Sequence, residues 1–122
     1  MASEKIKILV VDDEPDVVDT LKNSLSVRGY EILNAYSGEQ ALAILETEKV
    51  DLVLLDIIMH GISGIAVAKV IKERYPHVKI IVITAHPEAG ERMLRDTLLE
   101  GLIIKPCVLE SLYDKLLELQ AN

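Results

Sequence analysis

The chain has 122 residues, which is enough for one domain with a real hydrophobic core and too few for two independent cores. Half of the residues are hydrophobic and 27% are charged, a composition that argues against a disordered chain, a collagen-like repeat or a disulfide scaffold. The formal net charge is −7, from 13 basic and 20 acidic residues, and the sequence has no basic cluster. Direct binding to nucleic acid is therefore not expected.

The single cysteine, Cys107, excludes an internal disulfide and is typical of a protein from a reducing compartment. The sequence shows neither a signal peptide nor a run of about 18 apolar residues of the kind that crosses a membrane. We therefore expect a cytoplasmic protein that does not associate with membranes.

Short apolar runs rich in β-branched residues alternate along the chain with longer stretches of helical spacing. The runs predict strands over Lys7–Val11, Glu31–Ala35, Leu52–Asp56, Lys79–Thr84 and Leu102–Ile104. The first, third and fourth of these are apolar almost throughout, as expected of central parallel strands that helices cover on both faces.

A helix is predicted after each strand. The first begins with a cap and a proline in Asp13-Glu14-Pro15, and the second with a capping box formed by Ser37 and Gln40. The third and fourth are expected over about Gly64–Tyr75 and Glu88–Leu99. The last has an apolar face made of Leu109, Leu112, Tyr113, Leu116 and Leu117.

Five successive strand–helix units with short connections predict an α/β fold with an open, doubly wound five-stranded parallel sheet and five flanking helices. A closed barrel would need more strands. In such sheets, ligands bind beyond the carboxyl ends of the strands. The candidate functional residues are therefore those that follow the strands.

Polar side chains stand at four of these strand ends. Asp12 and Asp13 follow the first strand, Asp56 and Thr84 end the third and fourth, and Lys105 follows the fifth. Each residue alone is more often a helix cap, a strand residue or a solvated surface group. Together, carboxylates at one edge repel each other by up to about 4 kcal/mol per close pair at an effective dielectric of 20. A cation is therefore expected among them.

A site with few carboxylate ligands, and with room for water and for a phosphate oxygen, is typical of Mg²⁺. Lys105 adds a second positive charge and Thr84 a hydroxyl donor, so the set suits phosphoryl transfer by positioning and electrostatics. No cysteine, serine or histidine lies at the centre of the cluster, which leaves a carboxylate as nucleophile. Asp56 is the natural choice because it ends the middle strand.

Four segments, VVDDEPD, LVLLDIIMHGISG, IVITA and IIKP, resemble the motifs of the receiver domain of two-component response regulators. The resemblance covers roughly residues 5–120. It implies a sheet of order 2-1-3-4-5, Asp56 as phosphoacceptor, and Mg²⁺ held by Asp12, Asp13, Asp56 and the main-chain carbonyl of Ile58. Thr84 would be the switch hydroxyl and Lys105 the phosphate partner. The family commonly has a cis bond at the position of Lys105–Pro106.

The resemblance further implies one receiver domain over residues 1–122, with a core of about 5–120. A sensor histidine kinase or a phosphotransfer protein would be the phosphoryl donor, and an unidentified protein or domain would receive the output. The chain would catalyse only its own phosphorylation and slow dephosphorylation, and in that sense would not be an enzyme. Its oligomeric state, its kinase and its place in a stand-alone or larger regulator stay open.

Three alternative functions fit the sequence less well. A phosphate-independent pseudo-receiver would keep the fold without the switch, but the complete set of site residues argues against it. A turnover phosphatase would have an acid/base aspartate two residues after the nucleophile, where Ile58 stands. A flavin carrier would need a Ser-, Thr- and Gly-rich phosphate cradle after the first strand, in place of the acidic DDEPD.

The sequence departs from the family pattern at several positions. Leu102 replaces the usual aromatic residue before Lys105; it is either a plain strand residue, or the switch works without a rotating ring. One residue fewer than usual separates Thr84 from Lys105, which predicts a reshaped fourth helix or exit loop. His60 and His86 are surface histidines in the simplest interpretation; the alternative is that His86 controls access of water to the phosphoryl group.

Overall fold

The computed structural model describes residues 5–59, 61–96, 99–105 and 109–120. His60, Cys107 and the predicted cis bond of Lys105–Pro106 lie outside this described part. Strands and helices alternate through the chain, with β1 at Lys7–Val11, α1 at Pro15–Val27, β2 at Glu31–Ala35, α2 at Gly38–Thr47, β3 at Leu52–Leu55, α3 at Gly64–Arg74, β4 at Lys79–Thr84, α4 at Pro87–Asp96, β5 at Gly101–Ile104 and α5 at Leu109–Gln120.

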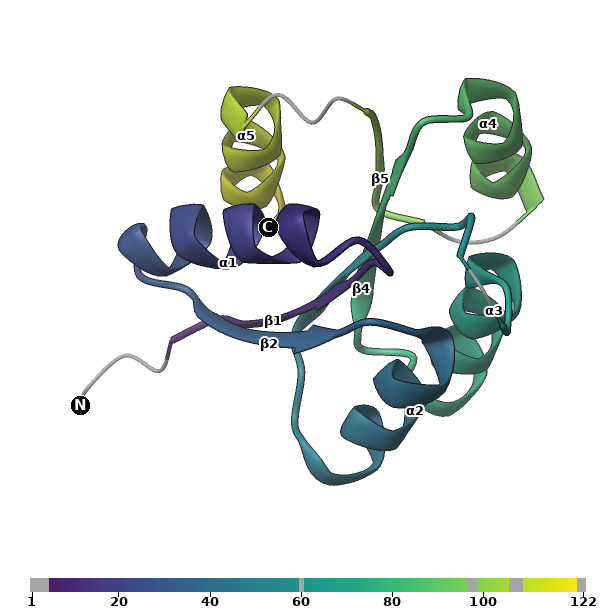
Figure 1. The fold of residues 1–122 in the computed structure, drawn as a ribbon, viewed down its shortest axis with the longest axis horizontal. Coiled ribbons are helices and arrows are strands. Elements are labelled where there is room, and N and C mark those ends of the chain that lie inside the picture. The colour runs from purple at the N-terminus through teal and green to yellow at the C-terminus, as the bar shows by residue number, and fades with distance from the viewer. Residues whose placement is uncertain (1–4, 60, 97–98, 106–108, 121–122) are drawn as a thin grey trace.

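The strands form one parallel sheet in the order β2-β1-β3-β4-β5, as predicted. Helices α1 and α5 lie on one side of the sheet, and α2, α3 and α4 lie on the other (Figure 1). Alternate residues of a strand enter opposite layers. On β1, Leu9 packs toward α2 and α3, and Ile8 packs toward α1 and α5. This explains the apolar character of the central strands, whose side chains are buried on both faces.

Most predicted element boundaries are confirmed, and a few are shifted. The fourth helix starts at Pro87, and its described part ends at Asp96 instead of reaching Leu99. The fifth strand begins at Gly101, one residue early, because Glu100 already donates its backbone N–H to the carbonyl of Ile80 at 2.9 Å. The third strand ends at Leu55, which leaves Asp56 just beyond the sheet.

The helix starts show which capping predictions hold. The hydroxyl of Ser37 caps α2 by accepting from the backbone N–H of Gln40 at 3.1 Å. Pro15 occupies the first position of α1, as predicted. Glu14, from the predicted cap segment, is the cap residue of α1, and its side chain makes no capping bond. The Asp12 carboxylate instead accepts from the Glu14 N–H at 3.0 Å.

None of the helices in the described part of the chain combines the length and the apolar character needed to cross a bilayer.

Candidate functional site

The strand register brings the carboxyl ends of the central strands together. Val11 of β1 pairs with Leu55 of β3, so the residues that follow them, Asp12 and Asp56, lie next to each other. The backbone N–H of Asp56 donates to the carbonyl of Val11 at 3.0 Å, which extends this alignment one residue beyond the strands. The parallel pairing therefore decides that the two carboxylates meet.

Asp12, Asp13 and Asp56 form what we call the acidic cluster. One carboxylate oxygen from each lies within 4.8 Å of the other two. Two ligands of a single Mg²⁺ are separated by at most about 4 Å, twice the Mg–O distance. Carboxylate oxygens are also the ligand type that this hard cation prefers. The acidic cluster is therefore close to the spacing that a divalent cation requires.

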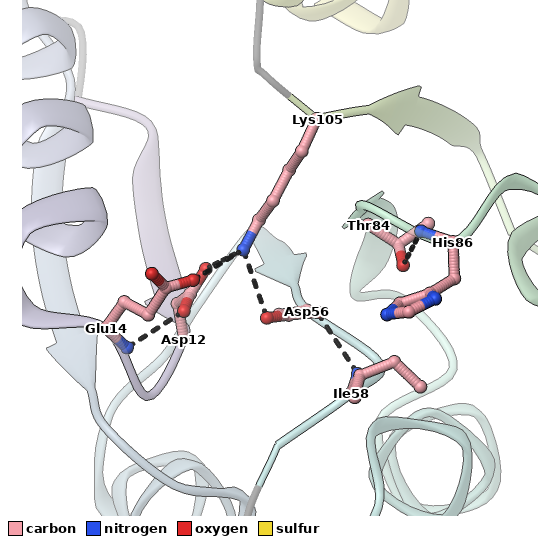
Figure 2. A network of polar contacts seen from close by, with 7 residues as sticks. All are labelled: Asp12, Glu14, Asp56, Ile58, Thr84, His86 and Lys105. Carbon is pink, nitrogen blue, oxygen red and sulfur yellow. Dashed lines mark hydrogen bonds and ion pairs between the residues drawn. The ribbon is translucent and has the colours of Figure 1, made fainter.

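Lys105 reaches into the acidic cluster from the end of β5 (Figure 2). Its ammonium nitrogen lies 2.9 Å from Asp12 Oδ2 and 3.2 Å from Asp56 Oδ2. Both carboxylates are nearly buried, with side-chain exposures of 4% and 7%. The sequence led us to expect a cation among these carboxylates, and in this structure the Lys105 ammonium takes that role.

Glu14 is a member of the site that the sequence pattern marks only as part of a helix cap. Its carboxylate lies 3.4 Å from the Lys105 ammonium, although the Glu14 side chain is 65% exposed. The only signal for it in the sequence is that it continues the acidic run after Asp12 and Asp13. Exposed ion pairs of this kind contribute little to stability.

Thr84 and Ile58 lie on the far side of Asp56 from Asp12 (Figure 2). Thr84 is fully buried, and its carbonyl accepts from the backbone N–H of Lys105 at 2.7 Å. The backbone N–H of Ile58 donates to Asp56 Oδ1 at 3.1 Å and so orients the carboxylate, while Ile58 as a whole residue is 52% exposed. The structure thus gathers all six predicted site residues at one edge of the sheet.

Two further positions that the sequence singles out lie near Thr84. His86 is exposed, and its backbone N–H donates to the Thr84 hydroxyl at 3.0 Å. Leu102 is partly buried against the core. A methyl group added to Gly90 of α4 would overlap the Leu102 side chain and lie 3.1 Å from Thr84 Cγ2, so Leu102 packs against α4 next to Thr84.

The environment shifts the proton affinity of two site residues. Burial raises the pKa of Asp56, and the charge of Asp12 adds to this effect, while the Ile58 N–H and Lys105 act against it. Burial also acts to lower the pKa of Lys105, but its hydrogen bonds and ion pairs with Asp12 and Asp56 outweigh burial and raise that pKa. Lys105 therefore stays charged, and Asp56 carries its negative charge at an energetic cost.

Comparison with known proteins identifies a family and several relatives of this chain. Residues 8–117 match the family described as the response regulator receiver domain. The chain is 40% identical over 88 residues to the alkaline phosphatase synthesis transcriptional regulatory protein PhoP of Bacillus subtilis, covering 72% of this chain and 37% of PhoP. It is 33% identical over 108 residues to the response regulator MprA of Mycolicibacterium vanbaalenii, covering 88% of this chain and 47% of MprA.

Solved structures resemble the fold closely. The response regulator TrrA of Thermotoga maritima, crystallised in complex with Mg²⁺-BeF, has a TM-score of 0.86 and 38% identity over 93% of this chain and 98% of its own. A CheY-like receiver domain protein of Methanospirillum hungatei has a TM-score of 0.89 and 27% identity, covering 94% of this chain and 93% of its own. The chain spans less than half the length of the curated relatives PhoP and MprA. By its matched residues and its fold, the chain belongs to the response regulator receiver domain family.

Proposed function

We propose that this receiver accepts a phosphoryl group on Asp56 and thereby changes its affinity for another protein. The observation that carries the proposal is the arrangement around Asp56: a nearly buried carboxylate beside two others, with the Lys105 ammonium within 3.2 Å. A carboxylate nucleophile with fixed positive charge beside it suits phosphoryl transfer, in which positioning and electrostatics supply most of the catalysis.

In the proposed reaction, one oxygen of Asp56 forms a new bond to phosphorus. The bond between phosphorus and the donor breaks, and its electron pair leaves with the donor. The Ile58 N–H and Lys105 hold the two Asp56 oxygens at 3.1 and 3.2 Å, so the carboxylate is oriented before a donor arrives. Asp12, Asp13, Asp56 and the Ile58 carbonyl are the proposed ligands of Mg²⁺, which would supply positive charge to the phosphoryl oxygens.

Lys105 and Thr84 are the proposed partners of the bound phosphoryl group. The negative charge of the bound phosphoryl group would draw the Lys105 ammonium toward the phosphoryl oxygens. The Thr84 hydroxyl would donate to the same oxygens. Thr84 and Lys105 are already joined by a backbone hydrogen bond of 2.7 Å, so a shift of Thr84 would also move the end of β5.

The proposed donor is a histidine kinase or a phosphotransfer protein, and the proposed output is an interaction with a separate protein or domain. We further propose one receiver domain over residues 1–122, with a core of about 5–120, that catalyses only its own phosphorylation and slow dephosphorylation. Ile58, two residues after Asp56, offers no general base for hydrolysis. The lone cysteine supports a reducing compartment such as the cytoplasm.

Intact-mass spectrometry after incubation with Mg²⁺ and acetyl phosphate tests the proposal. We expect a gain of one phosphoryl group in the wild-type protein and no gain in Asp56→Asn or in the presence of EDTA. A gain that persists in Asp56→Asn would contradict the assignment of the phosphoacceptor. No gain in folded wild-type protein, from acetyl phosphate or from a phosphorylated histidine kinase, would instead support a phosphate-independent interaction module.

A further inference from the structure

Glu39 lies outside the site described above but contacts the loop that follows Asp56. It is the second residue of α2, and its Oε2 accepts a hydrogen bond from the backbone N–H of Ile62 at 3.3 Å. Gly61, the residue before, has a positive φ of 82°. A Cβ atom there would lie 3.0 Å and 3.2 Å from the two Glu39 carboxylate oxygens. The carboxylate therefore rests directly on the backbone of residues 61 and 62.

The start of α2 gives Glu39 a rigid base. Ser37 caps the helix through the Gln40 N–H, and the Gln40 side chain accepts in return from the Tyr36 N–H at 2.8 Å. Gly38, the first helical residue, is buried and packs so closely on Ile62 that an added methyl group would overlap the Ile62 side chain. Two successive residues of α2 thus contact the same point of the loop.

The loop in question follows Asp56, the proposed phosphoacceptor; its described residues are 57–59 and 61–63, and Ile58 is one of them. Its first residues are held by the bond from the Ile58 N–H to Asp56 Oδ1. Its end is held by the Gly64 N–H, which donates to the Ile57 carbonyl at 3.2 Å. Glu39 holds the segment between these two anchors from outside, across a sequence separation of 23 residues.

We propose that Glu39 is a positioning residue for cation binding: its carboxylate holds Gly61 and Ile62 so that the loop presents the Ile58 carbonyl beside Asp56. The inference rests on the proposed function, because it takes that carbonyl as a Mg²⁺ ligand. Groups that do not bind a metal themselves but orient its ligands are commonly worth about 10- to 100-fold in metal affinity, which is lost when they are removed. Glu39 acts here through the backbone of the loop.

A simpler role for Glu39 is to stabilise α2, because an acidic residue in the first turn interacts favourably with the helix dipole. The two roles separate in the variants Glu39→Gln and Glu39→Ala. Glutamine keeps an oxygen that can accept from the Ile62 N–H but loses the charge that the dipole favours. Alanine loses both. Glu110→Ala, which removes an exposed acidic residue from the first turn of α5, is the matched control.

Mg²⁺ titrations followed by backbone amide NMR shifts of the full chain test the proposal. We expect Glu39→Ala to weaken Mg²⁺ binding about 10-fold, and Glu39→Gln and Glu110→Ala to stay near the wild-type affinity. The Ile62 amide should exchange its hydrogen faster in Glu39→Ala than in Glu39→Gln. With acetyl phosphate, Glu39→Ala should need more Mg²⁺ for half-maximal phosphorylation and reach the wild-type rate at saturation.

Wild-type Mg²⁺ affinity in Glu39→Ala would overturn the proposal, as would an equal loss in Glu39→Gln and Glu39→Ala. Thermal unfolding without Mg²⁺ shows whether a loss of Mg²⁺ affinity comes only from a less stable α2. Failure of the proposed function is a different result, because the wild-type protein itself would then show no Mg²⁺-dependent phosphorylation of Asp56.

Discussion

Asp56 is held in a position that disfavours its own charge. It is 5% exposed and has Asp12 beside it, and these two features raise its pKa despite the Lys105 ammonium and the Ile58 N–H. A carboxylate with a raised pKa is more basic and more nucleophilic. Active sites commonly carry such a cost in stability, because the groups that react are arranged for the reaction and not for the folded state.

The raised pKa of Asp56 predicts how stability depends on pH. Between the ordinary pKa of 3.8 and the higher pKa in the folded state, the folded protein binds more protons than the unfolded chain. Stability is therefore lost as pH rises through this window. Without divalent cations, we expect Asp56→Asn to have a higher urea midpoint than wild type at pH 7. The difference should vanish below pH 3.8.

Asp19→Asn, which neutralises an exposed residue of α1, is the control for a general change in net charge. A lower urea midpoint for Asp56→Asn at pH 7 would contradict the prediction. It would show that the attraction between Asp56 and Lys105 outweighs the cost of burial.

At the scale of secondary structure, Glu100 joins three elements at the opposite end of the sheet from the acidic cluster. Its carboxylate accepts from the backbone N–H of Ile80 in β4 at 2.6 Å and from the Lys72 ammonium of α3 at 3.0 Å. Its own N–H donates to the Ile80 carbonyl, so Glu100 extends the pairing of the short strand β5 with β4. Ile80 is fully buried, which leaves its N–H no water as a substitute partner.

We expect Glu100→Ala to lower the free energy of unfolding by about 1 to 3 kcal/mol, the usual cost of leaving a buried backbone donor without a partner. Glu100→Gln keeps the acceptor oxygen and loses only the ion pair with Lys72. It should cost less than about 1 kcal/mol, because that pair is partly exposed. Urea denaturation at pH 7 measures both variants. Equal losses in the two would show that the ion pair, and not the Ile80 N–H, accounts for the role of Glu100.

For the molecule as a whole, the proposed cation site links ligand binding to folding. The acidic cluster is assembled only in the folded chain, since its members follow two different strands. A cation that binds the folded and not the unfolded state stabilises the protein in proportion to its occupancy. The net charge of −7 adds a second, non-specific effect, because salt of any kind screens repulsion among acidic residues.

We therefore expect Mg²⁺ at 100 times its dissociation constant to raise the free energy of unfolding by about 2.7 kcal/mol. Sodium chloride at the same ionic strength should produce only the screening component. Asp12→Asn should lose most of the difference between the two salts, because it removes one member of the acidic cluster. Thermal unfolding with each salt measures the effect, and equal stabilisation by Mg²⁺ and sodium chloride would argue against a specific cation site.

Much of this protein follows from local features of the sequence. Continuous apolar runs mark β1, β3 and β4 because central parallel strands are covered on both faces, and Ser37 marks the start of α2 because its hydroxyl caps the helix. The meeting of the residues that follow Val11 and Leu55 was also predictable, since parallel strands end at a common edge.

Only the tertiary structure decided which charges and backbone groups balance one another. Glu14 reaches Lys105 across 91 residues and Glu39 reaches Ile62 across 23, and no periodicity or cap marks either contact in the sequence. The direction of the Asp56 pKa shift likewise depends on burial competing with nearby charges at particular distances. Hydrophobic patterning is encoded residue by residue, whereas electrostatic balance is a property of the distances that folding creates.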